Sequence, residues 1–399
     1  MPLSLSQRSL NIAPSVTLAI DTQAKEMKAR GEDVIGFGAG EPDFDTPEYI
    51  RDAAKYALDH GMTRYTPVTG TLSFRKQICK KLQNDNGLSY DPAQIIVTNG
   101  AKQALFDAFS AIINDGDEVI IPSPAWISYP ELVRMTGGVV IDAPGDEKDN
   151  FVVTAETIRP LVTEKTKALI LCSPSNPNGC VWTKEHLQEI ADLAVEKGFY
   201  VISDEIYEKL IYDGLKHISI ASLGDKIKDQ TIIVNGHSKS YAMTGWRIGY
   251  AAGPLNVIKA MSAFQSHATS NANSVAQYAA QVALSEGGEI LDEMVEEFQT
   301  RRDLIHGLIN DVDGLSANMP QGAFYIMMSI NDIIGKSYHG EIINDSMDFA
   351  RLLLGAQKVA VVPGKPFGAN RHLRLSYATS RDNIEKGIAR IAQFVSELK

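Results

Sequence analysis

The feature that most constrains the fold is an alternation of short apolar runs with longer amphipathic stretches, which begins near residue 95. The apolar runs are IIVT (95–98), DEVIIP (117–122), GGVVIDA (137–143), KALILCSP (167–174), FYVISDE (199–205), TIIVNG (231–236) and RIGYAAG (247–253). Several are continuously apolar, as strands buried on both faces should be. The stretches between them, such as 101–113 and 184–198, carry apolar residues at helical spacing. The alternation predicts an α/β sandwich with a mostly parallel sheet, whose ligands gather at the carboxyl ends of the strands.

Beyond this alternation the sequence changes character at both ends. A charge-rich helical pattern starts at residue 289, and two strand-like runs, GAFYIMMSI and HLRLSYA, follow it. Near the other end, GEDVIGFGAGEPDFDTP is rich in Gly and Pro, which suits it to lining a site. We predict an N-terminal segment of residues 1–45 that packs with the small domain, a large domain of residues 46–290 and a small α+β domain of residues 291–399.

Charge and cysteine content exclude several classes of protein. Asp and Glu outnumber Lys and Arg by 49 to 38, and the net charge of −11 disfavours nucleic acid and anionic membranes as partners. The 3 cysteines contain no CxxC pair, which indicates a reducing compartment without structural zinc. No basic leader and no apolar run of about 18–20 residues is visible, so we expect a cytoplasmic protein without a membrane span and without a bound metal.

Polar side chains follow three of the predicted strands. Asp204 and Tyr207 come after FYVIS, Asn176 lies in the turn SPSNPNG, and Ser238 and Lys239 come after TIIVNG. Because the carboxyl ends of parallel strands meet at one edge of a sheet, these side chains are expected to serve one site. Taken singly, Lys239 could be a solvated surface lysine and Asp204 a helix cap.

A second group of residues is suited to binding a phosphate. The segment IIVTNGAKQALF runs from strand to helix through Gly100, and the first N–H groups of the helix, at Ala101 and Lys102, would form an anion site. Ser238 and Arg247 are the side-chain donors that would complete it. By itself this strand–glycine–helix pattern is a weak signal, because it matches neither the P-loop nor the GxGxxG spacing.

One ligand would use both groups at once. A phosphate would occupy the helix N-terminus, a protonated ring nitrogen would pair with Asp204, and a ring hydroxyl would accept from Asn176 and Tyr207. An aldehyde would bind Lys239 covalently. These are the groups of pyridoxal 5'-phosphate (PLP), for which a lysine imine and an Asp partner to the pyridine nitrogen are typical.

The ordered motifs resemble those of a known family over nearly the whole chain. They are AGEPDFDTP, YTPVTG, GAKQALF, PSPAWISYP, SPSNPNG, SDEIYE, SKSYAMTGWRIGY, QGAFY and LRLSYATS. In this order they are similar to the fold type I PLP enzymes, in particular to class I aminotransferases of the bacterial aspartate type. The resemblance implies a three-layer sandwich with a mostly parallel seven-stranded sheet, a smaller α+β domain and a homodimer with shared active sites.

The resemblance also implies roles for residues around the cofactor. Lys239 would be the lysine that binds PLP and would act in catalysis with Asp204 and Tyr207. Trp126 would stack on the ring. Tyr65 would reach the phosphate of the neighbouring subunit.

For the substrate, the resemblance implies that Arg374 clamps the α-carboxylate. Asn176 and the backbone N–H of Gly40 would assist it. Arg374 stands between two leucines on an apolar strand, an awkward place for a solvated charge, which favours a functional role.

Substrate choice rests on fewer residues. A dicarboxylic amino acid needs a second cation, for which Lys102 is the candidate, with the hydroxyls of Ser15 and Thr17 as weaker donors. The resemblance implies transfer of the amino group of aspartate to 2-oxoglutarate, and aromatic or prephenate aminotransferase activity on the same fold is the alternative. A non-catalytic PLP-binding regulator is a more distant one, because no basic helix-turn-helix precedes residue 32.

Overall fold

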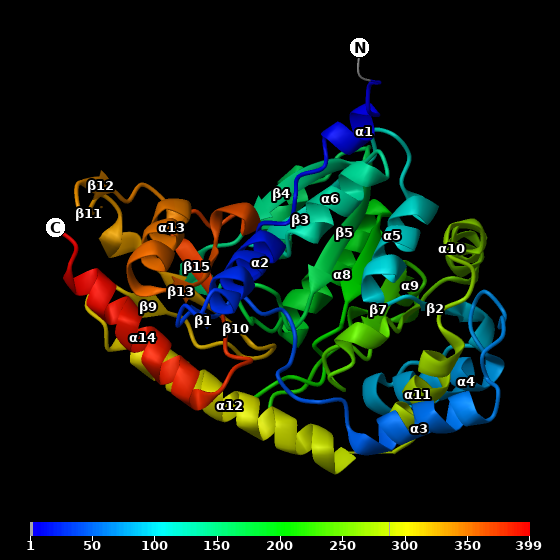
Figure 1. The fold of residues 1–399 in the computed structure, drawn as a ribbon. Helices are drawn as coiled ribbons and strands as arrows, with labels where there is room; N and C mark the ends of the chain where they lie inside the picture. Colours follow the sequence, from blue (N-terminus) through cyan, green and yellow to red (C-terminus); the bar gives the residue numbers. More distant parts are fainter. Residues whose placement is uncertain (1–2, 287) are drawn as a thin grey trace.

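The computed structural model describes residues 3–286 and 288–399, and its centre is a sheet of seven strands (Figure 1). The strands are β2 (Ile95–Thr98), β3 (Glu118–Ser123), β4 (Val139–Pro144), β5 (Thr166–Cys172), β6 (Tyr200–Asp204), β7 (Thr231–Gly236) and β8 (Gly249–Ala252). Their order is β2-β8-β7-β6-β5-β3-β4. Strand β8 runs antiparallel to β2 and β7, and the pairs from β7 to β4 are parallel. The predicted mostly parallel sheet is confirmed.

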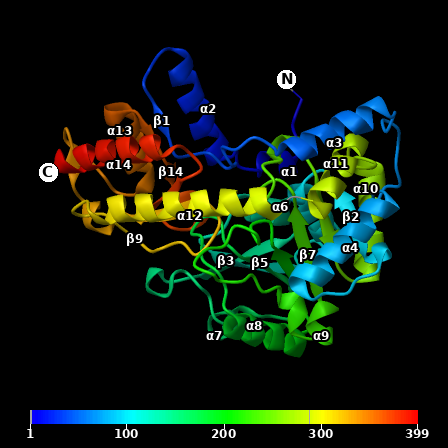
Figure 2. The same ribbon diagram turned by 90° about the horizontal axis from the view of Figure 1, so that it is seen from below.

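Helices cover both faces of the sheet because successive strand residues point to opposite sides. Val119 belongs to the buried cluster that contains α5 (Ala101–Ile112), whereas the adjacent Ile120 belongs to the cluster that contains α8 (Lys184–Lys197). The other helices around the sheet are α3 (Glu48–Asp59), α4 (Leu72–Asn86), α6 (Ser128–Met135), α7 (Ala155–Ile158), α9 (Asp225–Lys228), α10 (Leu255–Ala268) and α11 (Ser274–Ser285). The three-layer sandwich predicted from the sequence is therefore present (Figures 1 and 2).

Local sequence explains where these helices begin and end. Helix α8 starts at the N-cap Thr183, whose hydroxyl accepts the N–H of His186, and it ends at Gly198 with φ of 76°. Helix α5 has no side-chain cap, because its N-cap is Gly100. Its first N–H groups are therefore left for another partner.

The rest of the chain surrounds a second sheet of order β14-β15-β10-β9. Its strands are β9 (Ser316–Ala317), β10 (Tyr325–Ser329), β14 (Val362–Pro363) and β15 (His372–Ser376). The helices beside it are α12 (Gly288–Asn310), α13 (Ser346–Gln357) and α14 (Arg381–Ser396), and the long α12 runs along the lower edge of the molecule in Figure 1. A two-stranded ribbon is formed by β11 (Ser337–Tyr338) and β12 (Glu341–Ile342).

The N-terminal segment contributes α1 (Gln7–Leu10), α2 (Val16–Ala29) and β1 (Ile35–Gly36). Strand β1 pairs in parallel with β13 (Val359–Ala360), so residues far apart in the sequence lie side by side. Ala24 and Met27 of α2 pack on Leu354 in the same region. The three domain boundaries drawn from the sequence stay a prediction. None of the helices in residues 3–286 and 288–399 combines the length and apolar character needed to cross a membrane.

Candidate active site

The candidate site lies where three adjacent strands end. Strands β7, β6 and β5 are neighbours in the sheet, and each is followed by polar side chains that the sequence singled out. Asp204 is the last residue of β6, Asn176 follows β5 and Lys239 follows β7. Asn176 and Asp204 are buried, whereas Lys239 is half-buried.

Lys239 is the group at the centre of this site. Its Nζ donates a hydrogen bond to the carbonyl oxygen of Gly40. Burial lowers the pKa of Lys239 to about 8; repulsion by Arg247 and Arg374 adds to this effect, and Glu41 opposes it. Lys239 is therefore a lysine that is partly neutral near pH 8 and able to act as a nucleophile or a base. The contact made by Gly40 uses its carbonyl, not the N–H singled out from the sequence.

Asp204 is held by two donors. Its Oδ2 accepts the hydroxyl of Tyr129 at 2.8 Å, and its Oδ1 accepts the N–H of Ile206 at 3.2 Å. Burial raises the pKa of Asp204 to about 6, although both hydrogen bonds lower it. A carboxylate in this position gains stability from a cationic partner. Sequence reasoning missed Tyr129, whose only signal was its position three residues after Trp126 in SPAWISYP.

Arg374 forms the opposite end of the site. Its Nη1 donates to Oδ1 of Asn176 at 3.2 Å and its Nη2 to the carbonyl of Gly38 at 3.0 Å. The guanidinium lies 4.4 Å from the ring centre of Tyr325 and 5.2 Å from that of Phe367. Its side chain is 2% exposed, and Nε has no hydrogen-bond partner among the described residues. A buried guanidinium that no described carboxylate neutralises is suited to an anionic ligand.

Tyr207 connects the two sheets. Its hydroxyl lies 3.1 Å from the hydroxyl of Tyr325 on β10, and both side chains are buried. Burial raises the pKa of Tyr207 well above its usual range, so the hydroxyl keeps its proton at neutral pH. Tyr325, in the motif QGAFY, is a second site residue that sequence reasoning did not name.

The N-terminus of α5 and Arg247 meet at the third part of the site. Gly100 has φ of 80°, and a Cβ there would collide with the guanidinium of Arg247. That guanidinium is exposed and donates to the carbonyls of Thr244 at 2.8 Å and Asn99 at 3.4 Å. Backbone N–H groups and a cation therefore meet in a space that only glycine leaves open, which is the chemistry of a phosphate cradle.

Lys102 and Trp126 lie beside this cradle. The Nζ of Lys102 is 4.8 Å from the ring centre of Trp126. Lys102 is exposed by surface area, yet partial desolvation, followed by repulsion from Arg247, lowers its pKa. Trp126 packs edge-on against Tyr129 with ring centres 5.3 Å apart, and Ser238 is buried after the end of β7. Trp126 therefore packs against the tyrosine that hydrogen-bonds Asp204.

Three of the residues singled out from the sequence, Tyr65, Ser15 and Thr17, are not joined to this constellation by a hydrogen bond within the described residues. Tyr65 is 91% exposed. Ser15 is the N-cap of α2, where its hydroxyl accepts the N–H of Leu18 at 3.4 Å, and Thr17 lies in the first turn of that helix. Within the described residues, none of the three forms a hydrogen bond or ion pair with Lys239. The structural role of Ser15 is therefore to cap the N-terminus of α2.

Comparison with known proteins identifies the family of the chain. The family described as aminotransferase class I and II matches residues 32–391. The chain is 46% identical to an aspartate aminotransferase of Geobacillus stearothermophilus, over 98% of this chain and 99% of that protein. It is 45% identical to an aspartate/prephenate aminotransferase of Thermus thermophilus, over 98% of each. The crystal structure of the aspartate aminotransferase from Rhizobium meliloti covers 100% of both chains with a TM-score of 0.97 and 41% identity. The chain belongs to the class I and II aminotransferases.

Proposed function

We propose that this protein is a PLP-dependent aspartate aminotransferase, which transfers the amino group of L-aspartate to 2-oxoglutarate and releases oxaloacetate and L-glutamate. The observation that carries the proposal is that two guanidinium groups act electrostatically on Lys239: Arg247, near the α5 N-terminus, and Arg374, beside Asn176. A reactive amine near two anion-binding groups suits a phosphorylated cofactor at one of them and a substrate carboxylate at the other. The full-length likeness to aspartate aminotransferases supports the same conclusion.

The residues present fit PLP. Gly100 leaves the cradle open, and among the described residues the buried Asp204 has no cationic hydrogen-bond partner, which a protonated ring nitrogen would supply. The residues that would hold PLP are Gly100, Ala101, Lys102, Ser238 and Arg247 at the phosphate, Trp126, Asp204, Asn176 and Tyr207 at the ring, and Lys239 at the aldehyde. When bound, PLP supplies an electron sink for negative charge at the substrate Cα.

The protein's own residues would then divide the work. Arg374 binds the substrate α-carboxylate and orients the Cα–H bond, assisted by Asn176 and the N–H of Gly40. Lys239, through its lowered pKa, takes the proton from Cα and later returns one. Asp204 keeps the ring nitrogen protonated. The first keto acid leaves before the second arrives, which predicts ping-pong kinetics.

Selection of a dicarboxylic substrate is assigned to Lys102. The exposed ammonium stands beside Trp126, where it could pair with the side-chain carboxylate of aspartate or glutamate. Ser15 and Thr17 are the weaker donors for the same contact.

The proposal includes a homodimer with shared active sites. The exposed side chain of Tyr65 supports it, since a partner would bury a tyrosine that is now 91% exposed. In that dimer, Tyr65 of the partner subunit would complete the phosphate site. A cytoplasmic location is also proposed, supported by three free cysteines.

Prephenate or aromatic aminotransferase activity is the second candidate; the name of the Thermus thermophilus relative favours prephenate. Both activities would use the same Lys239, Asp204 and Arg374. A panel of amino donors in single-turnover mode separates them, because each competent donor changes the absorbance of the bound cofactor.

The proposal is tested on purified protein loaded with PLP. We expect a yellow protein that loses its colour on addition of aspartate and regains it with 2-oxoglutarate. Asp204→Ala should slow this change by several orders of magnitude, because the ring nitrogen loses the carboxylate that keeps it protonated. A protein that binds PLP but leaves aspartate unreacted would instead be a non-catalytic binder.

A further inference from the structure

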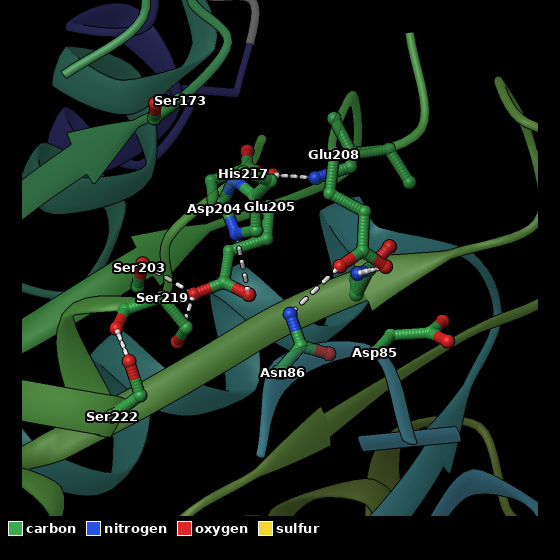
Figure 3. A network of polar contacts seen from close by, with 12 residues as sticks. Asp85, Asn86, Ser173, Ser203, Asp204, Glu205, Glu208, His217, Ser219 and Ser222 are labelled. Atoms are coloured by element: carbon green, nitrogen blue, oxygen red, sulfur yellow. Dashed lines mark hydrogen bonds and ion pairs between the residues drawn. The ribbon is translucent and has the colours of Figure 1, made fainter. Parts of the chain in front are cut away.

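The segment from Asp204 to Glu208 has two faces, and only one of them belongs to the site described above. Asp204 and Tyr207 contact Tyr129 and Tyr325 on the site side. Glu205 and Glu208 point away from it into a polar network that Figure 3 shows from close by. Both carboxylates are buried, with 0% and 7% of their surface exposed. Buried carboxylates are costly unless paired, so this second face calls for an explanation.

Glu208 is the acceptor for three donors. Its Oε1 accepts Nζ of Lys81 and, at 2.7 Å, Nδ2 of Asn235; its Oε2 accepts Nδ2 of Asn86 at 3.1 Å. Lys81 and Asn86 lie on α4, and Asn235 lies on β7. Lys81 is itself buried, with 8% of its surface exposed. One carboxylate therefore joins the segment after β6 to two other elements.

The contact with Asn235 reaches the strand that carries Lys239. Asn235 also accepts, through Oδ1, the N–H of Gly236 at 2.7 Å, which fixes the end of β7. Lys239 follows three residues later. Glu208 thus links the chain that holds Asp204 to the chain that holds Lys239, from behind the site.

The charges of the network are balanced by its own residues. Although burial raises the pKa of Glu208, Lys81 lowers it to about 2, so the carboxylate is ionised. Glu205 lies 3.1 Å from Nε2 of His217 and accepts the hydroxyls of two serines. Glu205, Glu208 and His217 also offer ligand atoms within 4.8 Å of one another. The ammonium of Lys81 neutralises Glu208, and a protonated His217 would neutralise Glu205.

We propose that Glu208, neutralised by Lys81, is a positioning residue of the reaction: it sets Asp204 and Tyr207 relative to Lys239 by joining their chain segment to β7. The inference rests on the proposed function for the roles of Asp204 and Lys239. A carboxylate is required because it accepts from Lys81, Asn86 and Asn235 together, whereas a glutamine would turn a donor toward one of them. Misplacement of catalytic groups by about 1 Å can cost about 100-fold in rate. A residue that holds these groups from outside the site can therefore affect the rate strongly.

The test compares Glu208→Gln with a matched control, Thr231→Val. Thr231 is buried at the other end of the same strand, where its hydroxyl donates to the carbonyl of Ile227, and both substitutions keep the side-chain volume. We expect both variants to lower Tm. Only Glu208→Gln should lower kcat for aspartate by about 10- to 100-fold with KM within about twofold, and shift the pH midpoint of the bound cofactor's absorbance. Lys81→Arg keeps the cation beside Glu208 and should therefore cause neither the loss in kcat nor the shift of the pH midpoint.

A measurement without cofactor separates this inference from the proposed function. In the full-length protein free of PLP, hydrogen exchange should speed up over residues 204–210 and 235–239 in Glu208→Gln and not in Thr231→Val. Asn235→Ala leaves Glu208 paired with Lys81 and should likewise speed up hydrogen exchange over residues 235–239. This variant replaces Glu208→Gln in the test if Glu208→Gln does not fold. Unchanged exchange in these segments overturns the inference. If the wild type fails to react with PLP and aspartate, the proposed function is wrong. Hydrogen exchange would still test whether Glu208 joins the segment after β6 to β7.

Discussion

The two ends of the candidate site are built differently. At the end proposed to bind the cofactor phosphate (the phosphate end), Gly100 and Ala101 are adjacent in the sequence, and Arg247 is exposed and donates to backbone carbonyls. At the end proposed to bind the substrate α-carboxylate (the carboxylate end), Arg374 is 2% exposed and donates to Asn176 and Gly38, and these three residues lie in separate parts of the chain. The first end is a local turn with a cation beside it. The second is a buried guanidinium that tertiary packing has assembled.

The difference teaches what each end can contribute. An exposed cation is screened by water and acts mainly through hydrogen bonds to its ligand. A desolvated guanidinium acts in a medium of low dielectric constant and gains more from a paired anion. We therefore expect substitutions at the carboxylate end to have the larger effects, and to act on the substrate and not on the cofactor.

Among substitutions at the two ends, Arg374→Lys is expected to have the largest effect. A lysine offers a point charge in place of a planar fork, so the bidentate contact with the α-carboxylate is lost. kcat/KM for aspartate should fall about 100-fold, as loss of charged hydrogen bonds worth about 3 kcal/mol implies, with the dissociation constant of PLP unchanged. Steady-state kinetics and a cofactor titration measure the two quantities. Equal losses in both would show that the ends are not separate.

The complementary substitution, Arg247→Ala, should weaken PLP binding by about tenfold, the effect of one charge-assisted hydrogen bond of about 1.5 kcal/mol. At saturating PLP, KM for aspartate should stay within about twofold of the wild-type value. Fluorescence titration of the cofactor-free protein gives the dissociation constant, and Arg247→Lys provides the control that keeps the charge. A large rise in KM for aspartate would show that Arg247, and not only Arg374, binds the substrate.

A smaller, selective effect is expected for Lys102→Ala. Because the ammonium is exposed, its ion pair with a side-chain carboxylate is worth about 1 kcal/mol, or about fivefold in kcat/KM. The loss should apply to aspartate and glutamate and spare apolar amino acids, while Lys102→Arg keeps the preference. Equal losses on all donors would remove Lys102 from the role of specificity residue.

The smallest effect concerns the pKa of Lys239, which both ends influence. The rate at which the cofactor-free protein takes up PLP should rise with pH and level off above about pH 8, because the neutral amine is the nucleophile. Repulsion by Arg247 and Arg374 lowers this pKa, so Arg247→Gln and Arg374→Gln should each move the midpoint to higher pH by a fraction of a unit. Stopped-flow absorbance gives the midpoints, and a shift to lower pH would contradict the argument.

The sequence predicts those site residues that follow a strand, and not those whose role depends on a partner remote in the chain. Gly100, Asp204 and Lys239 can be predicted as site residues because each stands at the end of a predicted strand, where ligands of such sheets gather. Tyr129 and Tyr325 were not found, because an aromatic residue with a hydroxyl reads as core until its partner is known. Ser15 was singled out as a substrate donor, and the structure shows its hydroxyl on the N–H of Leu18.

Neighbouring residues are enough to predict the alternation of strands and helices, the sheet they form and the local turn at Gly100, because periodicity and backbone conformation are local properties. Which groups are desolvated and which are paired depends on tertiary packing: within the described part of the chain, Arg374 is buried with no partner on Nε, burial lowers the pKa of Lys239, and Glu208 joins the segment after β6 to β7. Desolvation and pairing depend on distances between residues remote in the chain. A sequence pattern does not contain those distances.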